Sequence, residues 1–219
     1  MPFYIRVPSL ITPVHRITQT EEPLEARRKF MRTIGQASVL SESDWKKLES
    51  VANQKHRLLW AILRFTAARI TETLELRIKD VYKDVSRKIP LDEIVFRQET
   101  RKGKDKNHTV PICSELRLRL KDYSPLSNPD DYLFPGIEGR LSYEAALVYL
   151  KKSAERVGLD DKKIVTHCGR RSCITELARH GTDLRTIQAV SGHASIANLQ
   201  RYIEIDPERT KNALETIFA

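Results

Sequence analysis

Residues 166–205 read THCGRRSCITELARHGTDLRTIQAVSGHASIANLQRYIEI, and this stretch concentrates polar side chains that suit a phosphate. A pair of purely structural helices would not need all of these groups. The side chains in question are His167, Arg170, Arg171, His193 and Tyr202.

Their spacing places several of them together. His167 and Arg170 are three residues apart at the start of a predicted helix, so they share one helical face. The N-terminus of a helix also favours an anion. His193 follows Gly192 in a predicted turn, and Tyr202 comes nine residues later. The stretch therefore indicates a phosphate site beside a tyrosine.

Such residues suit metal-free cleavage of a DNA strand. The scissile phosphodiester gains negative charge on its non-bridging oxygens in the transition state, and the planar donor forks of arginines fit those oxygens. A phenol ionises far more readily than an aliphatic alcohol, which makes a tyrosine a suitable nucleophile. The covalent link to tyrosine keeps the energy of the broken phosphodiester, so resealing would need no ATP.

The composition agrees with a nucleic-acid partner. The 219 residues carry a formal net charge of +9, with 40% hydrophobic and 31% charged residues. A basic balance of this kind points to a polyanion. No apolar run approaches the roughly 18 residues of a membrane span, and no secretory signal is apparent, so we expect a cytoplasmic, nucleoid-associated protein. The three cysteines, which we expect to be inert packing groups, are Cys113, Cys168 and Cys173.

Capping residues and periodicity predict a mainly α protein with a small antiparallel β-sheet (α+β). Ser41 caps a first helix, and residues 57–68 are apolar nearly all round, which predicts a central buried helix. Thr71 is predicted to cap a short helix that runs through Leu76. A hairpin is predicted from residues 93–99 and 107–112.

Further helices follow the hairpin. One begins after Ser142 and ends at Gly158, and another runs from about 167 to 180. Thr182 is predicted to cap the next helix, and Ser195 is predicted to cap a helix that carries Tyr202. We divide the chain into an N-terminal arm or linker (1–38), a catalytic domain (39–206) and a tail helix (207–219).

The residues at 166–205 resemble the C-terminal signature of the tyrosine recombinases, or phage integrase family. That signature reads His-x-x-Arg, then Gly-His, then Tyr nine positions further on, as HCGR, GH and Tyr202 do here. TAARITETLELRIKDV (66–81) resembles the family's upstream block, and RKGKDKNHTVPI (101–112) resembles its lysine hairpin. The resemblance covers roughly residues 40–210.

The resemblance implies a role for each matched residue, with no cofactor and no metal. Tyr202 attacks and forms a 3′-phosphotyrosyl link, Arg69 and Arg170 grip the non-bridging oxygens, and His193 helps to bind the phosphate. Lys102, or else Lys104, protonates the leaving 5′ oxygen. His167 assists proton transfer or holds the phosphate. Glu72 supports the turn of Arg69 and is not a catalyst.

The chain departs from the family pattern in three respects. Ala67 stands where the family usually has glycine, and Gly169 stands where it usually has a bulky apolar residue. Neither change removes a functional group, but both are expected to loosen the site. Only 35–40 residues precede the catalytic region, whereas most relatives carry an N-terminal domain that clamps DNA. A minimal class that includes the fimbrial DNA invertases also lacks that domain.

The resemblance further implies double-stranded DNA as partner, with a dimer on each site and a tetramer in the paired complex. Two alternatives stay open at this point. Residues 175–202 can be read as a helix-turn-helix module that binds DNA without chemistry. The chain can also be an inactive relic of a recombinase. Arg171 is interpreted as a local contact under every alternative.

Overall fold

The fold was analysed in a computed structural model that describes residues 37–100, 106–202 and 215. The predicted N-terminal arm and tail helix therefore lie almost wholly outside the described residues. Within the described part, no helix is both long and apolar enough to cross a membrane. The α-helices are α2 (Glu42–Val51), α3 (Gln54–Thr66), α4 (Ile70–Leu74), α5 (Ser114–Asp122), α6 (Tyr143–Arg156), α7 (His167–Arg179) and α8 (Leu184–Ser191).

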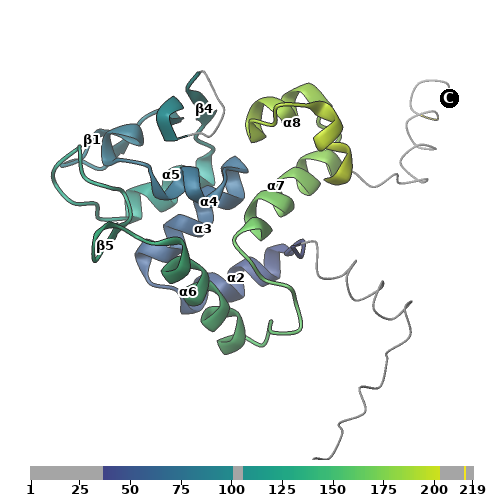
Figure 1. The fold of residues 1–219 in the computed structure, drawn as a ribbon, viewed down its shortest axis with the longest axis horizontal. Coiled ribbons are helices and arrows are strands. Elements are labelled where there is room, and N and C mark those ends of the chain that lie inside the picture. The colour runs from purple at the N-terminus through teal and green to yellow at the C-terminus, as the bar shows by residue number, and fades with distance from the viewer. Residues whose placement is uncertain (1–36, 101–105, 203–214, 216–219) are drawn as a thin grey trace, which may run out of the picture. The chain divides into compact units, whose positions relative to one another are not determined.

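Helix α3 is the central element, as its apolar sequence predicts. It packs against α4, α5 and α7, and the α3–α7 contact is the most extensive between any two elements described. Figure 1 shows α3 in the middle of the helices, with α7 leading from it to α8. A run of six successive side chains in α3 is buried, namely Leu58, Leu59, Trp60, Ala61, Ile62 and Leu63.

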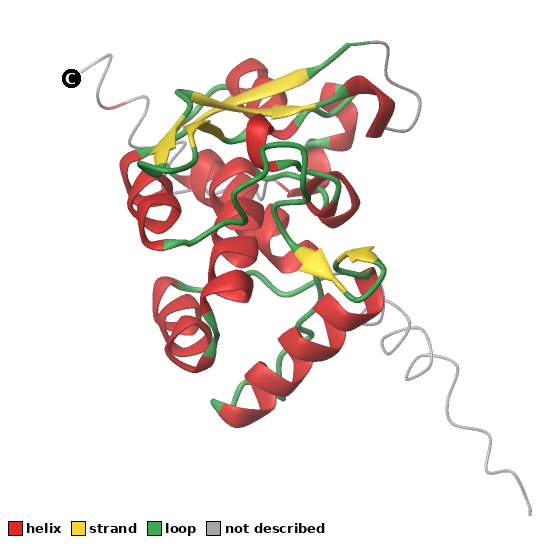
Figure 2. Cartoon of the chain, turned by 90° about the vertical axis from the view of Figure 1, so that its left-hand side faces the viewer, coloured by secondary structure: helices red, strands yellow, loops and turns green. Residues whose placement is uncertain are grey.

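The strands form short antiparallel ladders beside the helices (Figure 2). The predicted hairpin is confirmed as β3 (Glu93–Phe96) paired with β4 (His108–Pro111). Instead of one small sheet, the described residues contain three two-stranded ladders. The two that the sequence did not predict pair β1 (Tyr82–Asp84) with β2 (Ile89–Pro90), and β5 (Pro135–Gly136) with β6 (Gly139–Arg140).

The caps of the first long helices agree with the sequence. The Ser41 hydroxyl accepts a hydrogen bond from the backbone N–H of Asp44, and the Asp44 carboxylate accepts one in return, which forms a capping box at α2. The Ser142 hydroxyl caps α6 in the same manner by accepting from the N–H of Ala145.

Two predicted caps are wrong. Helix α4 begins at Ile70, so Thr71 is inside it, and the cap position is Arg69. Helix α8 is capped by Asp183 rather than by Thr182, because the Asp183 carboxylate accepts from the N–H groups of Arg185 and Thr186.

The segment before Tyr202 also differs from its prediction. Ser195 does cap a turn, but that turn and the next are the 3-10 turns η3 (Ile196–Asn198) and η4 (Gln200–Tyr202) rather than an α-helix.

Gly169 sets the distance between α7 and α3. A Cβ atom on this residue would stand 2.8 Å from Leu63 Cβ, 3.0 Å from its carbonyl carbon and 3.1 Å from the nitrogen of Arg64. Two of these neighbours are backbone atoms, so the contact has little room to adjust. The expectation that glycine loosens the site is therefore wrong here. The missing side chain allows a close crossing, which carries the adjacent Arg170 to the end of α3.

We expect Gly169→Ala to destabilise the fold. Alanine is normally the better helix former by about 0.5–1 kcal/mol, but overpacking against the α3 backbone should cost about 1–3 kcal/mol and reverse the sign. Urea unfolding would measure the change, with Arg179→Ala, an exposed substitution on the same helix, as the control. A Gly169→Ala protein as stable as the parent would contradict the close crossing.

Candidate active site

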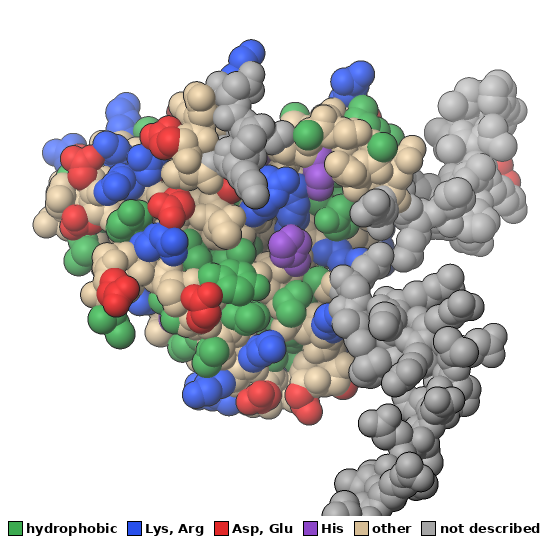
Figure 3. All heavy atoms as spheres, viewed as in Figure 1, with side chains coloured by type: hydrophobic (Ala, Val, Ile, Leu, Met, Phe, Trp, Pro, Cys, Tyr) green, Lys and Arg blue, Asp and Glu red, His purple; other side chains and the backbone are tan. Residues whose placement is uncertain are grey.

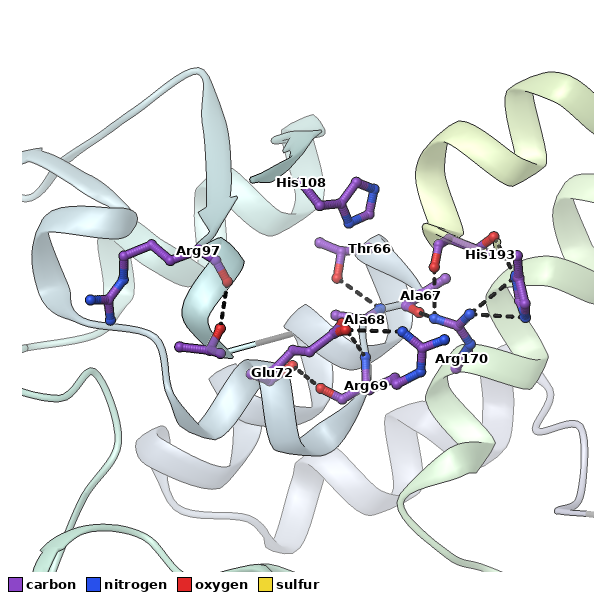
Figure 4. Close-up of polar contacts among 12 residues, drawn as sticks. Thr66, Ala67, Ala68, Arg69, Glu72, Arg97, His108, Arg170 and His193 are labelled. Carbon is purple, nitrogen blue, oxygen red and sulfur yellow. Dashed lines mark hydrogen bonds and ion pairs between the residues drawn. The ribbon is translucent and has the colours of Figure 1, made fainter. Parts of the chain in front are cut away.

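Arg170 lies in the first turn of α7 and is only 3% exposed. Its Nη1 donates to the backbone carbonyl of Ala67 at 2.5 Å and to that of Ser191 at 2.8 Å (Figure 4). Ala67 follows the last residue of α3, and Ser191 is the last residue of α8. One guanidinium therefore joins the C-terminal ends of two helices.

The two helix ends that hold Arg170 share the same backbone conformation. Ala67 and Gly192, which terminate α3 and α8, adopt left-handed backbone conformations with φ values of 52° and 63°. Helix C-termini carry a partial negative charge that stabilises a cation. Burial and the neighbouring Arg69 lower the pKa of Arg170 to about 10, whereas Tyr202 and Glu72 oppose the shift. The guanidinium therefore stays protonated at neutral pH.

His193 lies directly against Arg170. The Nη2 atom of Arg170 is 2.9 Å from Nε2 and 3.0 Å from Nδ1 of the imidazole. The backbone carbonyl of His193 accepts a hydrogen bond of 3.0 Å from the side chain of Gln188 in α8. The sequence prediction that Arg170 and His193 share one site agrees with this geometry.

Tyr202 completes this side of the site. Its ring centroid lies 5.7 Å from that of His193, and the two planes are tilted by 57°. The phenol is also close enough to the Arg170 guanidinium to be one of the influences that raise the pKa of that group. The half-buried ring packs on a small apolar cluster that includes Leu199 and Ile187. The tyrosine is thus beside both the buried arginine and the histidine.

Arg69 approaches from α4 and is held differently. Its Nη1 donates to Glu72 Oε1 at 2.9 Å, and its side chain is 37% exposed while that of Glu72 is almost fully buried. The Glu72 carboxylate also lies 3.5 Å from the backbone N–H of Arg69. Glu72 therefore fixes the start of α4 and the direction of Arg69, in agreement with a supporting role.

His167 is the first residue of α7 and reaches the surface. Partial desolvation of the ring and the positive charges of Arg170 and Arg69 lower its pKa. The imidazole is therefore mainly neutral at pH 7 and can accept or donate one proton through its ring nitrogens. On the molecular surface, Lys, Arg and His side chains gather between α4 and α8 (Figure 3).

The lysine predictions, Lys102 and Lys104, lie outside the described residues. The chain on either side is fixed, because Gln98 donates its backbone N–H to Asn107 Oδ1 at 2.8 Å. His108 in β4 donates from Nε2 to the carbonyl of Ala189 in α8 at 2.7 Å. This contact ties the hairpin to the helix that precedes His193, and Figure 4 shows His108 near the site.

Sequence reasoning missed three contributors to this arrangement: the Ala67 carbonyl, Ser191 and His108. The backbone carbonyl has no sequence signal at all. Ser191 had a weak sequence signal, because it lies two residues before His193. Burial raises the pKa of the Cys168 thiol and raises that of Cys173 to about 12, which fits packing groups, whereas Cys113 is exposed and does not pack as predicted.

The family model described as the phage integrase family matches residues 38–209. The chain belongs to the phage integrase family. The tyrosine recombinase XerA of Pyrococcus horikoshii is 28% identical over 182 residues, which cover 80% of this chain and 60% of XerA. The tyrosine recombinase XerD of Corynebacterium glutamicum is 33% identical over 158 residues, which cover 69% of this chain and 48% of XerD. The chain thus spans less than two thirds of either relative.

Solved structures share the fold. The crystal structure of XerA recombinase matches with a TM-score of 0.66 at 24% identity, over 84% of this chain and 65% of that one. XerH bound to its difH substrate matches with a TM-score of 0.62 at 23% identity, over 85% and 56%. The catalytic domain of bacteriophage HP1 integrase matches with a TM-score of 0.58 at 21% identity. The match covers 82% of this chain and 95% of the HP1 domain. The described fold is that of a tyrosine recombinase catalytic domain.

We expect Arg170→Ala to lose folding stability as well as chemistry. The substitution removes the donor from the carbonyls of Ala67 and Ser191, and each buried acceptor left unsatisfied costs about 1–3 kcal/mol. Arg170→Lys should also be destabilised, because one ammonium does not reproduce the planar fork.

Urea unfolding would measure both variants, with Arg185→Ala, an exposed substitution on α8, as the control. An unchanged midpoint for Arg170→Ala would show that the contacts to the two helix ends contribute nothing to stability.

Proposed function

We propose that this protein is a site-specific DNA recombinase or integrase that cuts and rejoins double-stranded DNA through a 3′-phosphotyrosyl intermediate. The observation that carries the proposal is the convergence of Arg170, His193 and Tyr202, which lie within hydrogen-bond or ring contact of one another. Membership of the phage integrase family supports the same chemistry.

In the proposed reaction, the Tyr202 oxygen attacks the scissile phosphorus, its proton passes to a base for which neutral His167 is the candidate, and the bond from phosphorus to the 5′ oxygen breaks. Arg69 and Arg170 bind the non-bridging oxygens, where their charge stabilises the five-coordinate transition state. His193 donates to the same phosphate. Lys102, with Lys104 as the alternative, protonates the departing 5′ oxygen, and His167 assists proton transfer or holds the phosphate.

The buried position of Arg170 adds one requirement. Both Nη1 hydrogens bond backbone carbonyls, and Nη2 lies against His193. A phosphate oxygen would therefore use the remaining donors of the guanidinium, of which Nη2 faces the histidine. Tyr202, whose ring lies against His193 and whose phenol acts on the same guanidinium, would then be beside the phosphorus that it attacks.

The assembly and location follow as further parts of the proposal. By family analogy, residues 39–206 are the catalytic domain, a dimer binds each site, and two sites pair in a tetramer. Residues 207–219 form a tail helix that docks on a neighbouring subunit. The protein acts in the cytoplasm, on the nucleoid, and uses neither metal nor ATP. Two structural neighbours, XerH bound to its difH substrate and the Tn1549 transposon integrase in complex with transposon right end DNA, support DNA as the partner.

A covalent trap tests the proposal. Nicked DNA from the flanks of the encoding gene, and a pool of nicked genomic fragments from the host, would be incubated with the protein and EDTA. We expect a DNA–protein adduct that survives denaturation for the parent and none for Tyr202→Phe, because only the phenol supplies the nucleophile.

Tyr143→Phe, a change at an exposed tyrosine of α6, is the matched control and should keep the adduct. DNA binding by the parent without any adduct would overturn the recombinase in favour of a binding module or a relic. Loss of the adduct in EDTA alone would overturn the metal-free mechanism.

The Arg69→Lys substitution tests whether Arg69 acts through its positive charge alone or through its planar guanidinium. The lysine keeps a cation beside Glu72 but loses the planar fork, so single-turnover cleavage should fall by about a hundredfold, the size of losing one preorganised oxyanion donor. DNA binding should change little. Cleavage at the parental rate would show that Arg69 does not grip the phosphate through its fork.

A further inference from the structure

Ser191 contacts two residues of the site but has no role in the proposed reaction as described above. It is the last residue of α8 and is only 2% exposed. Its hydroxyl oxygen lies 2.7 Å from the carbonyl of Ile187 and 2.7 Å from Nδ1 of His193. Its own backbone carbonyl accepts from Arg170 at 2.8 Å. One residue thus contacts both the buried arginine and the site histidine.

The hydrogen count fixes the direction of each bond. A serine hydroxyl has one hydrogen, and a backbone carbonyl can only accept. The hydroxyl therefore donates to Ile187 and has lone pairs left for His193. It follows that Nδ1 of His193 carries a hydrogen and donates it to the Ser191 oxygen.

The contact with Arg170 is consistent with this assignment. A guanidinium has donors but no acceptor, and Arg170 Nη2 lies 2.9 Å from Nε2 and 3.0 Å from Nδ1, so these two distances alone do not choose between the ring nitrogens. With the hydrogen placed on Nδ1 by the contact with Ser191, only Nε2 can accept from Arg170. The Ser191 contact therefore selects the neutral imidazole with its hydrogen on Nδ1.

We propose that Ser191 is a positioning residue that holds His193 by Nδ1, so that Nε2 is the ring atom turned toward Arg170 and the scissile phosphate. This inference rests on the proposed function for the role of the phosphate, but the proton assignment in the free protein does not.

The hydrogen bond from His193 Nδ1 to the Ser191 oxygen is compatible with both charge states of the ring. To donate to a phosphate oxygen, Nε2 must gain a proton, and the ring becomes an imidazolium with hydrogens on both nitrogens. The Ser191 oxygen accepts from Nδ1 in the neutral and the charged form alike. The ring therefore keeps its orientation while Nε2 exchanges Arg170 for a phosphate oxygen.

The first test is a proton-detected nitrogen NMR measurement on the free protein with labelled histidine. The six histidines are distinguished by repeating the spectrum with His193→Gln. We expect the His193 signals to report a hydrogen on Nδ1 and a bare Nε2. In Ser191→Ala, which keeps the backbone carbonyl for Arg170, we expect a mixture of tautomers. A hydrogen on Nε2 in the parent would overturn the proposal.

The second test is a double-mutant cycle on single-turnover strand cleavage. Ser191→Ala should lower the rate by roughly tenfold, the effect of one lost hydrogen bond, and Ser191→Thr should restore most of it. In a His193→Ala background, Ser191→Ala should have no further effect. Ser153→Ala, a buried serine of α6, is the matched control and should cleave normally.

The outcomes distinguish a failure of the positioning role of Ser191 from a failure of the proposed function. Equal effects of Ser191→Ala with and without His193 would overturn positioning and leave the recombinase intact. Absence of any adduct from the parent would overturn the proposed function, while the tautomer spectrum would still decide the proton assignment.

Discussion

A buried guanidinium held by two helix ends is the interaction on which the site depends. The acceptors that fix Arg170 are the carbonyls of Ala67 and Ser191, at the C-termini of α3 and α8. Helix ends supply only partial negative charge, about half an elementary charge each. The arginine is therefore fixed without being neutralised by a bonded carboxylate, and its positive charge stays available for a phosphate.

The two arginines of the site are supported by opposite means. Arg69 is partly exposed and is paired with the full charge of a buried carboxylate, Glu72. Arg170 is buried and held by dipoles, at a place set by the close crossing of α7 and α3 at Gly169. In the proposed reaction, the exposed Arg69 would reach toward the incoming DNA backbone, whereas the buried Arg170 would fix the position of the phosphorus. Rigid support of the second kind is what electrostatic preorganisation requires.

The residues proposed to carry the chemistry were predicted from the sequence, because their types and spacing are specific as a set, and the structure brings Arg170, His193 and Tyr202 together. It was less informative where several residues can do the same task. Thr182 and Asp183 are both competent caps, and only the backbone conformation at Asp183 decides between them. Helix α5 was missed because Leu116, Leu118 and Leu120 recur at every second residue, which is the period of a strand rather than a helix. The two further ladders were missed because their strands are only two or three residues long. The Ala67 carbonyl was unpredictable in principle, since every residue carries that group. The choice between Lys102 and Lys104 stays a prediction.

The contact between Arg170 and Ala67 spans 103 positions of the chain, and this separation has a consequence for synthesis. A chain leaves the ribosome N-terminus first, so Arg69 and Glu72 emerge early. The second anchor of Arg170 and the Tyr202 hydroxyl emerge only much later. A polypeptide that stops before Ser191 therefore lacks both the fixed cation and the attacking oxygen of the proposed reaction. Under the proposed function, the order of residues along the chain keeps such an incomplete copy from cutting DNA.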